Sequence, residues 1–204
     1  MHRLVLATRN VGKIEEFRRI FEEFAPGSIE LVGLEHFPHL VDVEETGDTF
    51  AENALLKARA VCRQTGFPAI ADDSGLSIDA LNGSPGVLSA RWSGAHGNDR
   101  ANMEKVLSEL RVLGDISRSA HFTCVTALVM PDGSQVTQEG TLSGEILTEP
   151  IGSNGFGYDP IFLPVGSGLS LAQMPARAKD AISHRGQSIR AIAPRVVSLL
   201  GALG

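Results

Sequence analysis

The sequence predicts an α/β protein with a mixed β-sheet flanked by helices. Apolar runs typical of strands alternate along the chain with segments whose apolar residues recur at helical spacing. One run, residues 121–130, is followed by the turn sequence PDGS and a second strand-like stretch, which predicts an antiparallel hairpin within an otherwise parallel pattern. The 204 residues are 43% hydrophobic and contain no repeat or credible linker, so we expect a single domain over residues 1–204.

The first part of the chain is expected to alternate strands and helices. Residues 3–8 have the pattern of a strand, and an amphipathic helix follows from Val11. After a possible strand near residues 29–32, Thr49 and Glu52 form a capping-box pair that begins a second helix, which Gly66 ends. The next segment, AIADDSG, is predicted to be a buried strand that ends in two carboxylates, and LSIDAL is a candidate for a separate strand.

The second part is expected to continue with helix, hairpin and helix. Asn98 or Asp99 can cap a helix that Gly114 closes. The hairpin follows, and a glycine-rich loop, GSNGFGYDP, precedes the C-terminal helix. Pro194 lies within the apolar stripe of that helix, where its missing N–H predicts a kink or a division into two helices.

Charge and cysteine content exclude several classes of function. The net charge is −6 and the 18 basic residues are scattered, which argues against a nucleic-acid polymer as partner but allows a small anionic ligand held with a divalent metal. Cys62 and Cys124 lie in apolar segments, as expected for buried thiols in a reducing compartment. Neither a signal peptide nor a membrane span is predicted, and no histidines have zinc-ligand spacing, so we expect a cytoplasmic protein without a membrane partner.

The segment TRNVGK, residues 8–13, lies between a predicted strand and a predicted helix. The unpaired N–H groups of a helix start, with Thr8, Asn10 and Lys13, suit a phosphate chain. It is not a P-loop, because Ala7 stands where the first glycine belongs. Taken alone, the segment favours the simpler alternative of a capped turn with a solvated lysine.

Asp72 and Asp73 are the strongest candidates for chemistry. Two adjacent carboxylates on a buried strand repel each other and lose hydration, a cost that a divalent cation offsets. Strand alternation sends them in opposite directions and predicts different tasks. A cap or turn interaction is the structural alternative, but it needs only one carboxylate. Glu44 or Glu45 is a possible third ligand, although acids before a helix are common in any case, and Lys57 on that helix is more often a solvated charge.

Two later segments are candidates for ligand contacts. In GFGYDP, glycines flank Phe156 and Tyr158, so the loop either presents a ring and Asp159 to a flat ligand or plugs the core with two aromatics. In KDAISHRG, residues 179–186, a lysine, a histidine and an arginine form a cationic cluster suited to a carbonyl or phosphate. Its alternative is a helix start capped by Ser183 with a surface histidine.

Six motifs in this order resemble the inosine/xanthosine triphosphate pyrophosphatase family, which hydrolyses non-canonical purine nucleoside triphosphates. The motifs are LATRNVGK, EETGDTFAENALLKA, AIADDSGLSIDAL, PGVLSARWSG, GFGYDPIF and AISHRG, and the resemblance spans about residues 4–190. It implies a homodimer whose elongated mixed sheet carries two lobes with a nucleotide-binding cleft between them. It also implies an Mg²⁺-dependent hydrolase that converts ITP, dITP or XTP to the monophosphate and pyrophosphate, cleansing the nucleotide pool.

The resemblance also implies site residues. Glu45 and Asp73 would bind Mg²⁺, and Asp73, or its neighbour Asp72, would be the base that activates water. Lys179, His184 and Arg185 would contact the base and its 6-oxo group, with Phe156 stacked on the purine. The full set implied for substrate binding is Thr8, Arg9, Asn10, Val11, Gly12, Lys13, Lys57, Ser74, Phe156, Gly157, Tyr158, Asp159, Lys179, His184 and Arg185.

The chain departs from the family pattern at a few positions. Leu88 and Trp92 stand where the family often has tyrosine, and Ala178 stands where it has an acid. None of these lies at the implied metal site. Two other functions fit the same residues less well: a phosphomonoesterase with Asp72 or Asp73 as nucleophile, which lacks the usual Asp-x-Asp spacing, and a nucleotide-sensing module without turnover.

Overall fold

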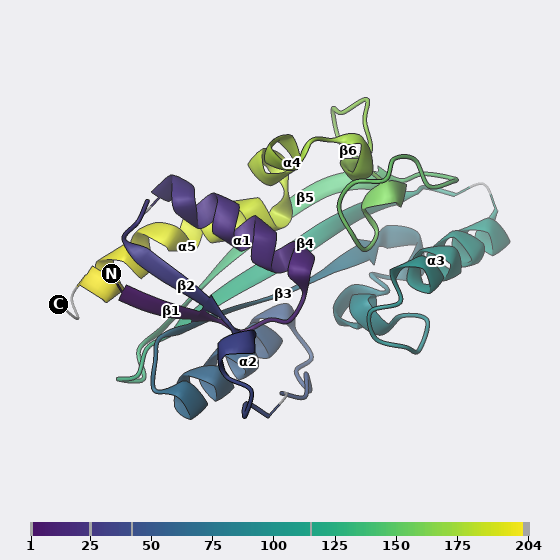
Figure 1. Cartoon of the computed structure of the whole chain (residues 1–204). Coiled ribbons are helices and arrows are strands. Elements are labelled where there is room, and N and C mark those ends of the chain that lie inside the picture. The colour runs from purple at the N-terminus through teal and green to yellow at the C-terminus, as the bar shows by residue number, and fades with distance from the viewer. Residues whose placement is uncertain (1, 25, 42, 115, 202–204) are drawn as a thin grey trace. The chain divides into compact units, whose positions relative to one another are not determined.

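The structure is a computed structural model that describes residues 2–24, 26–41, 43–114 and 116–201 (Figure 1). Its helices and strands follow the predicted alternation. The helices are α1 (Val11–Phe24), α2 (Phe50–Thr65), α3 (Asp99–Leu113), α4 (Ala176–Ile182) and α5 (His184–Gly201). The strands are β1 (His2–Leu6), β2 (Ile29–Gly33), β3 (Ala69–Ile78), β4 (Ser119–Val129), β5 (Gln135–Ile146) and β6 (Phe162–Pro164). Short 3-10 helices connect them, among them η3 (Gly86–Arg91).

In the described part of the chain, six strands form one mixed sheet in the order β2-β1-β3-β4-β5-β6. Strand β1 pairs in parallel with β2 and with β3, whereas β5 and β6 are antiparallel. The predicted hairpin joins β4 to β5 through a turn in which Met130 N–H donates to Ser134 O at 2.8 Å. The predicted mixed sheet is therefore confirmed.

The chain folds into two compact units. Unit 1 comprises Met1–Asp73, Cys124–Gly140 and Arg185–Gly204, and unit 2 comprises Ser74–Thr123 and Thr141–His184. Strands β3, β4 and β5 and helix α5 each contribute residues to both units. The nucleotide cleft between two lobes stays a prediction, and each unit is described below by itself.

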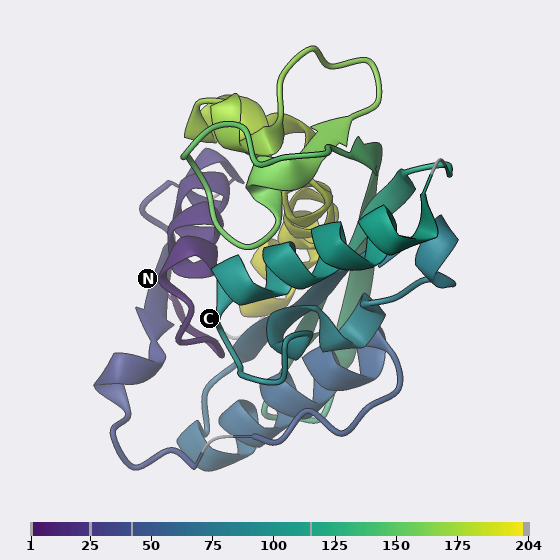
Figure 2. The ribbon, with the colours of Figure 1, turned by 90° about the vertical axis from the view of Figure 1, so that its right-hand side faces the viewer.

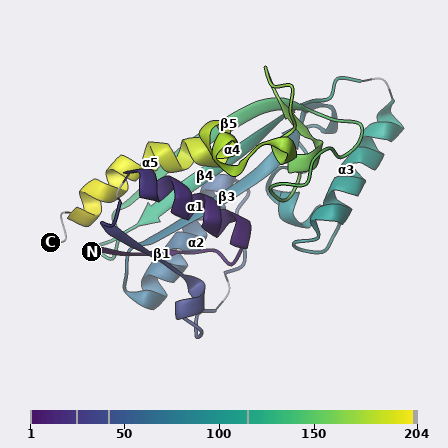
Figure 3. The same cartoon turned by 45° about the horizontal axis from the view of Figure 1, so that its top comes forward.

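Unit 1 has helices on both faces of its strands. Helices α1 and α5 lie side by side on one face, where Phe17 and Ile192 pack with Leu4, Leu6 and other apolar residues (Figure 3). Helix α2 covers the opposite face (Figure 1) and packs through Ala54, Ala58 and Val61 on residues such as Val5 and Ala69. Consecutive strand residues thus serve opposite faces, as strand geometry requires.

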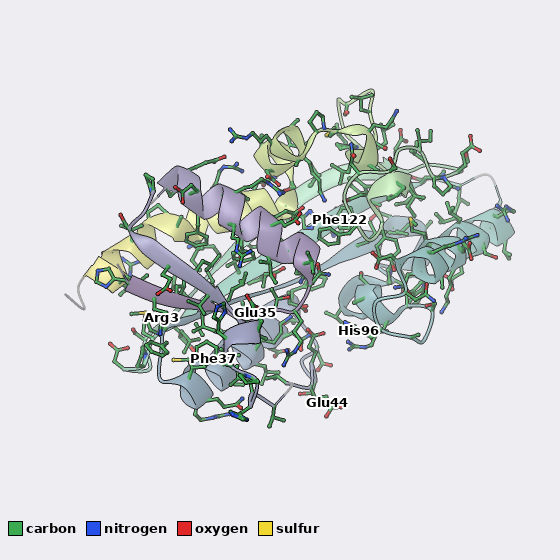
Figure 4. The ribbon with its side chains drawn as sticks, viewed as in Figure 1. Arg3, Glu35, Phe37, Glu44, His96 and Phe122 are labelled. Atoms are coloured by element: carbon green, nitrogen blue, oxygen red, sulfur yellow. The ribbon has the colours of Figure 1, made fainter. Side chains whose placement is uncertain are left out.

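Unit 2 has its own apolar core. Val106, Leu107 and Leu110 of α3 belong to it, together with the later residues of β3, the early residues of β4 and the segment that contains β6. Phe122 of β4 and Phe162 of β6 are in contact, with ring centroids 4.6 Å apart. Phe122 is labelled in Figure 4.

The helix ends follow the predicted caps. Thr49 begins α2 with a complete capping box, and Gly66 ends it at φ 72°. Asn98, rather than Asp99, caps α3, since its side chain accepts from Ala101 N–H.

One expectation about the continuity of an element was wrong, and a second was wrong in one of its two alternatives. AIADDSG and LSI form one ten-residue strand, so Asp72 and Asp73 lie inside β3 rather than at its end. Ser74 and Gly75 are extended there, because nothing in either residue forces a turn. Helix α5 is one element that continues through Pro194, so the division into two helices was wrong, while the kink at Pro194 stays a prediction. Pro194 lies on the exposed side of α5, whose buried side carries Ile192, Ala193 and Val196.

Among the described residues, no helix combines the length and apolar character that crossing a bilayer requires.

Candidate active site

The alternation of β3 sends its two acids to opposite faces of unit 1. Ile70 belongs to the core beneath α1 and α5, whereas Ala69 and Ala71 belong to the core beneath α2. Asp72 continues the first set and Asp73 the second. The predicted division of direction is confirmed by their contacts: Asp72 meets residues of α1 and α5, and Asp73 meets residues of α2.

Asp72 is held by two cations in the interior. Its side chain is 0% exposed, and its Oδ2 lies 2.9 Å from Lys13 Nζ and 3.1 Å from Arg185 Nε. Cys124 Sγ also lies 3.7 Å from this oxygen. Burial alone would raise the pKa of Asp72, but Lys13 and Arg185 outweigh it and bring this pKa well below its ordinary value. Asp72 is therefore ionised at neutral pH and anchors both cations.

Lys13 reaches Asp72 because of how α1 begins. Asn10 caps the helix by accepting from Lys13 N–H at 3.1 Å, and Thr8 Oγ1 accepts from Asn10 N–H at 3.2 Å. The capped turn that the sequence offered as the simpler alternative is therefore present. Its lysine is not solvated, however, since the side chain is 16% exposed and paired with Asp72. The turn and the ion pair together fix a cation beside the helix start; within the same segment Arg9 and Val11 are exposed and Gly12 is half-buried.

Arg185 connects this cluster to α1. Its Nη1 donates to Glu16 Oε2 at 2.6 Å while Nε donates to Asp72. Both carboxylate side chains and the guanidinium are nearly inaccessible to solvent. Burial would lower the pKa of Arg185, but Asp72 and Glu16 raise it above its ordinary value. Arg185 is thus a buried cation shared by two acids.

Asp73 belongs to a second cluster, with Glu45 and Lys57. Lys57 Nζ lies 2.7 Å from Glu45 Oε1 and 3.1 Å from Asp73 Oδ1, so the two carboxylates converge on one ammonium. Burial raises the pKa of Asp73 and prevails over the opposing effect of Lys57. For Lys57, burial lowers the pKa, but Asp73 and Glu45 prevail and raise it. Lys57 is therefore not the solvated charge that its helix position favours.

Asn53 holds this second cluster in place, and its role was not predicted from the sequence. Its Nδ2 donates to Asp73 Oδ2 at 3.2 Å and to Gly47 O at 3.3 Å, and its Oδ1 accepts from Gly47 N–H at 2.8 Å. A Cβ at Gly47 would lie 2.8 Å from Asn53 Oδ1, so only glycine allows this approach. The signal available in the sequence was an asparagine beside Ala54 on the buried face of α2.

The two acids of the EETG segment have different positions. Glu44 is exposed and lies at the periphery of the molecule (Figure 4), whereas the next residue, Glu45, meets Lys57. The neighbour that joins Asp73 is therefore Glu45, as the resemblance implies.

The donor set of Glu45 and Asp73 fits Mg²⁺. These carboxylates already converge on one positive charge, and Mg²⁺ is typically bound by one or two carboxylates together with waters and substrate phosphates. Across the described residues, no three His, Cys, Asp or Glu side chains form a metal-binding group. Two carboxylates would leave most positions of such a metal to waters and to a ligand.

Unit 2 contains the aromatic loop, residues 155–159. Tyr158 is buried and its hydroxyl donates to Ser89 O at 2.8 Å, whereas Phe156 is half-buried. Burial raises the pKa of Tyr158 above its ordinary value. Tyr158 therefore packs in the core, whereas the Phe156 ring stays partly exposed. That Phe156 presents its ring to a flat ligand stays a prediction.

Asp159 and Lys179 stabilise the aromatic loop from inside. Asp159 Oδ2 accepts from Phe156 N–H at 2.9 Å and is paired with Lys179 Nζ. The same ammonium lies 4.7 Å from the centroid of the Phe156 ring. Gly155 has φ 74°, and a Cβ there would collide with the Asp159 carboxylate, so this position requires glycine for both reasons.

The cationic segment KDAISHRG is distributed between the units. Lys179 pairs with Asp159 in unit 2, and Arg185 pairs with Asp72 and Glu16 in unit 1. His184 is 4% exposed and stacks on Phe122 with ring centroids 4.5 Å apart, so the surface histidine of the structural alternative was wrong. Periodicity gave no signal for these partners, because they are far away in sequence.

The predicted site residues thus form two groups. Unit 1 contains the segment 8–13 with Glu45, Lys57, Asp72, Asp73 and Arg185, and unit 2 contains Ser74, the aromatic loop, Lys179 and His184. Within unit 1, the structure brings Lys13 to Asp72 and Lys57 to Asp73. Glu16 and Asn53 join these clusters without having been predicted. The roles of all these residues toward a ligand stay predictions.

Known proteins resemble this chain over nearly its full length. A protein of Streptomyces coelicolor named dITP/XTP pyrophosphatase is 52% identical over 201 residues, which cover 98% of this chain and 100% of that protein. A relative from Cutibacterium acnes with the same name is 50% identical over 202 residues, covering 98% of each chain. The solved HAM1 protein of Coxiella burnetii superposes with a TM-score of 0.87 at 41% identity, covering 97% of this chain and 100% of that one. The sequence profile of the Ham1 family matches residues 4–195, and the chain belongs to that family.

Proposed function

We propose that this chain hydrolyses non-canonical purine nucleoside triphosphates such as dITP, ITP and XTP to the monophosphate and pyrophosphate. The observation that carries the proposal is the convergence of Glu45 and Asp73 on one cation, Lys57. Lys13, which is paired with the neighbouring Asp72, also acts electrostatically on Asp73, whose pKa burial raises and Lys13 lowers in part. The names of the relatives from Streptomyces coelicolor and Cutibacterium acnes support the substrate class.

The residues of unit 1 suit the phosphate chemistry. Thr8, Asn10 and Lys13 at the start of α1 would bind the phosphate chain through backbone N–H groups, polar side chains and the ammonium. Lys57 would add a second positive charge for the pyrophosphate that leaves. Both lysines are already oriented by carboxylates, so binding would require little additional ordering of their side chains.

Glu45 and Asp73 would hold Mg²⁺. When bound there, Mg²⁺ would neutralise charge on the phosphate oxygens. This cofactor is part of the proposal and rests on the donor set and on the resemblance.

We assign the base to Asp73 rather than to Asp72. Asp72 is fully buried against Lys13 and Arg185, which depress its pKa and make it a poor proton acceptor. Asp73 lies in the other cluster, with Glu45 and Lys57, where the proposal places the metal and its water. Asp73 would take the proton from the water that attacks the α-phosphorus, and Asp72 would fix Lys13.

The residues of unit 2 suit the nucleoside. The half-buried ring of Phe156 would stack on the purine, and the loop amides around Gly157 would contact the nucleoside. Lys179 and His184, with Arg185 of unit 1, are the candidates for reading the 6-oxo group. Because a 6-oxo group accepts hydrogen bonds whereas the amino group of adenine donates them, cationic donors would reject ATP.

The remaining expectations belong to the same proposal. A homodimer and a cytoplasmic location are what the resemblance and the composition imply, and a pool-cleansing role follows from the proposed reaction.

One assay tests the function. Purified protein is incubated with ITP and Mg²⁺, with ATP as the matched control, and the products are identified. The proposal expects IMP and pyrophosphate from ITP and much slower reaction of ATP. Orthophosphate as the sole phosphate product would favour a phosphomonoesterase, and unchanged ITP that nevertheless stabilises the protein would favour a sensing module; either result contradicts the proposal.

A further inference from the structure

We propose that Asp99 is a positioning residue for the aromatic loop, and that it sets the purine selectivity of the enzyme through the backbone of Gly157. This inference rests on the proposed function, because it takes the loop to bind the purine. Asp99 itself need touch neither substrate nor metal.

The contact is a charge-assisted hydrogen bond between two distant parts of the sequence. Asp99 Oδ2 accepts from Gly157 N–H at 2.7 Å, and the residues are 58 positions apart. Asp99 is the first residue of α3, and Figure 2 shows the loop between β5 and β6 descending to this end of the helix. The carboxylate therefore connects the loop to the helix start.

Asp99 is not required to cap the helix. Asn98 already does so, since its Oδ1 accepts from Ala101 N–H at 3.1 Å. Asp99 is exposed, and an exposed acid in the first turn of a helix has no need of a partner from a remote loop. The direction of its carboxylate toward Gly157 is thus a separate feature, which neither capping nor burial explains.

Gly157 is the centre of the loop that carries Phe156. It has φ 62°, and its neighbours are fixed by other contacts: Phe156 N–H donates to Asp159, and Tyr158 Oη donates to Ser89 O. A Cβ at Gly157 would meet no atom within 4 Å, so no neighbouring group lies against that side of the residue. The hydrogen bond to Asp99 is the contact that ties this turn to α3.

Hydrogen bonds of the buried Asn102 hold helix α3 in place. Asn102, which is 1% exposed, accepts from Ser93 N–H at 2.7 Å and donates to Ala90 O at 3.3 Å. These bonds join α3 to the end of η3, and Ser89 of η3 receives the Tyr158 hydroxyl. Two points of the aromatic loop therefore rest on one scaffold, and removing Asp99 releases only the point next to Phe156.

The expected effect is on recognition of the base and not on phosphoryl transfer. When the turn at Gly157 is released, the Phe156 ring loses its fixed position, so the KM for ITP rises roughly tenfold, as for loss of one charge-assisted hydrogen bond. The preference for ITP over ATP falls at the same time. Because the phosphate groups are bound by unit 1 in our proposal, a triphosphate without a base should react as before.

The test uses three variants of the full chain, with folding checked by far-UV circular dichroism. Asp99→Ala removes the acceptor, and Asp99→Asn removes the charge but retains an oxygen that accepts a hydrogen bond. Glu104→Ala is the matched control, because Glu104 is an exposed acid of the same helix whose partner is Arg100. Steady-state kinetics are measured with ITP, ATP and ribose 5-triphosphate, and hydrogen exchange is measured for the peptide that contains Gly157.

The results expected are a raised KM for ITP and faster exchange of the loop peptide in Asp99→Ala, partial recovery in Asp99→Asn, and no change in Glu104→Ala. Rates with ribose 5-triphosphate should be equal in all four proteins. Unchanged ITP kinetics in Asp99→Ala, or an equal loss with the base-free substrate, would overturn the inference. Failure of the wild-type protein to hydrolyse ITP would instead overturn the proposed function, while the exchange measurement would still decide whether Asp99 holds the loop.

Discussion

Replacing the two adjacent acids of β3 one at a time should have different consequences for stability. Asp72→Asn removes the charge that faces Lys13 and Arg185, and Asp73→Asn removes the charge that faces Lys57. The two substitutions are chemically identical and neighbour each other on one strand. Any difference between them therefore reports their surroundings and not the type of change.

The size of the Asp72 effect follows from its burial. Removing one partner of a buried ion pair costs about 3–5 kcal/mol, because the other charge stays in the interior. Arg185 keeps its ion pair with Glu16 at 2.6 Å, so we expect Asp72→Asn to lower the free energy of unfolding by about 3 kcal/mol, the lower end of this range. For a chain of this length that corresponds to a fall of about 6–12 °C in Tm.

Asp73→Asn should leave stability unchanged or increase it at neutral pH. Burial raises the pKa of Asp73, which means that its ionised form is less favourable in the folded than in the unfolded chain. Lys57 keeps Glu45 at 2.7 Å, so the ammonium is not left unpaired. Turnover, in contrast, should fall by at least about 100-fold, the contribution of a general base.

The contributions of Asp72 and Asp73 to stability should depend on pH in opposite directions. The folded-state pKa of Asp72 lies below the unfolded value, so its stabilisation is present above about pH 4 and is lost as the pH falls below that value. The folded-state pKa of Asp73 is raised, so its ionisation reduces stability as the pH rises through the range between the unfolded and folded values. Asp72→Asn should therefore flatten the acid limb of the stability profile.

Urea unfolding followed by far-UV circular dichroism at several pH values measures both effects, with ITP turnover measured in parallel. The assignment of the two acids would be refuted if Asp73→Asn were as destabilised as Asp72→Asn. It would also be refuted if Asp73→Asn hydrolysed ITP at the wild-type rate.

Further predictions concern other parts of the two groups. Asn53→Ala leaves Gly47 N–H and Asp73 Oδ2 without this partner and should cost about 2 kcal/mol in urea unfolding and lower kcat; wild-type values for both would remove Asn53 from the site. Gly155→Ala places a Cβ at φ 74° against the Asp159 carboxylate and should raise the KM for ITP with a loss of about 1–2 kcal/mol, whereas an unchanged KM would separate Gly155 from substrate binding. Burial raises the pKa of the Cys124 thiol to about 12, so a disulfide reagent at pH 8 should modify it only after unfolding in urea, and rapid modification of the native protein would contradict its placement.

The local elements were predictable because their signals are local. The capping box of Thr49, the closing Gly66 and the PDGS turn each act within a few residues, and each is present in the structure. The mixed sheet followed from the order of these elements. The predicted end of β3 was wrong because it also depended on local signals alone. Asp, Ser and Gly are typical of turns, and local propensity did not indicate that pairing within the sheet would continue the strand to Ile78.

The partners of the charged residues could not be predicted, since they are determined by the fold and not by spacing. Arg185 meets Glu16 across 169 positions, and Lys57 meets Asp73 across 16. Taken alone, Lys13 and Lys57 were each more simply explained as solvated charges. The resemblance to a family singled out both of them and Lys179, but only the packed structure shows that each of the three is paired with an acid.

The adjacency of Asp72 and Asp73 is a consequence of strand geometry. Side chains of neighbouring strand residues point to opposite faces, so two acids separated by one peptide bond can meet different helices. The α1–α5 face supplies Lys13 and Arg185, whose permanent charges keep Asp72 ionised. The α2 face supplies Lys57 and the amide of Asn53, whose weaker effect leaves burial dominant at Asp73. A sequence DD within a covered strand can thus place one carboxylate against Lys13 and Arg185 and the other against Lys57 and Asn53, and a separation by two residues would have placed both on the same face.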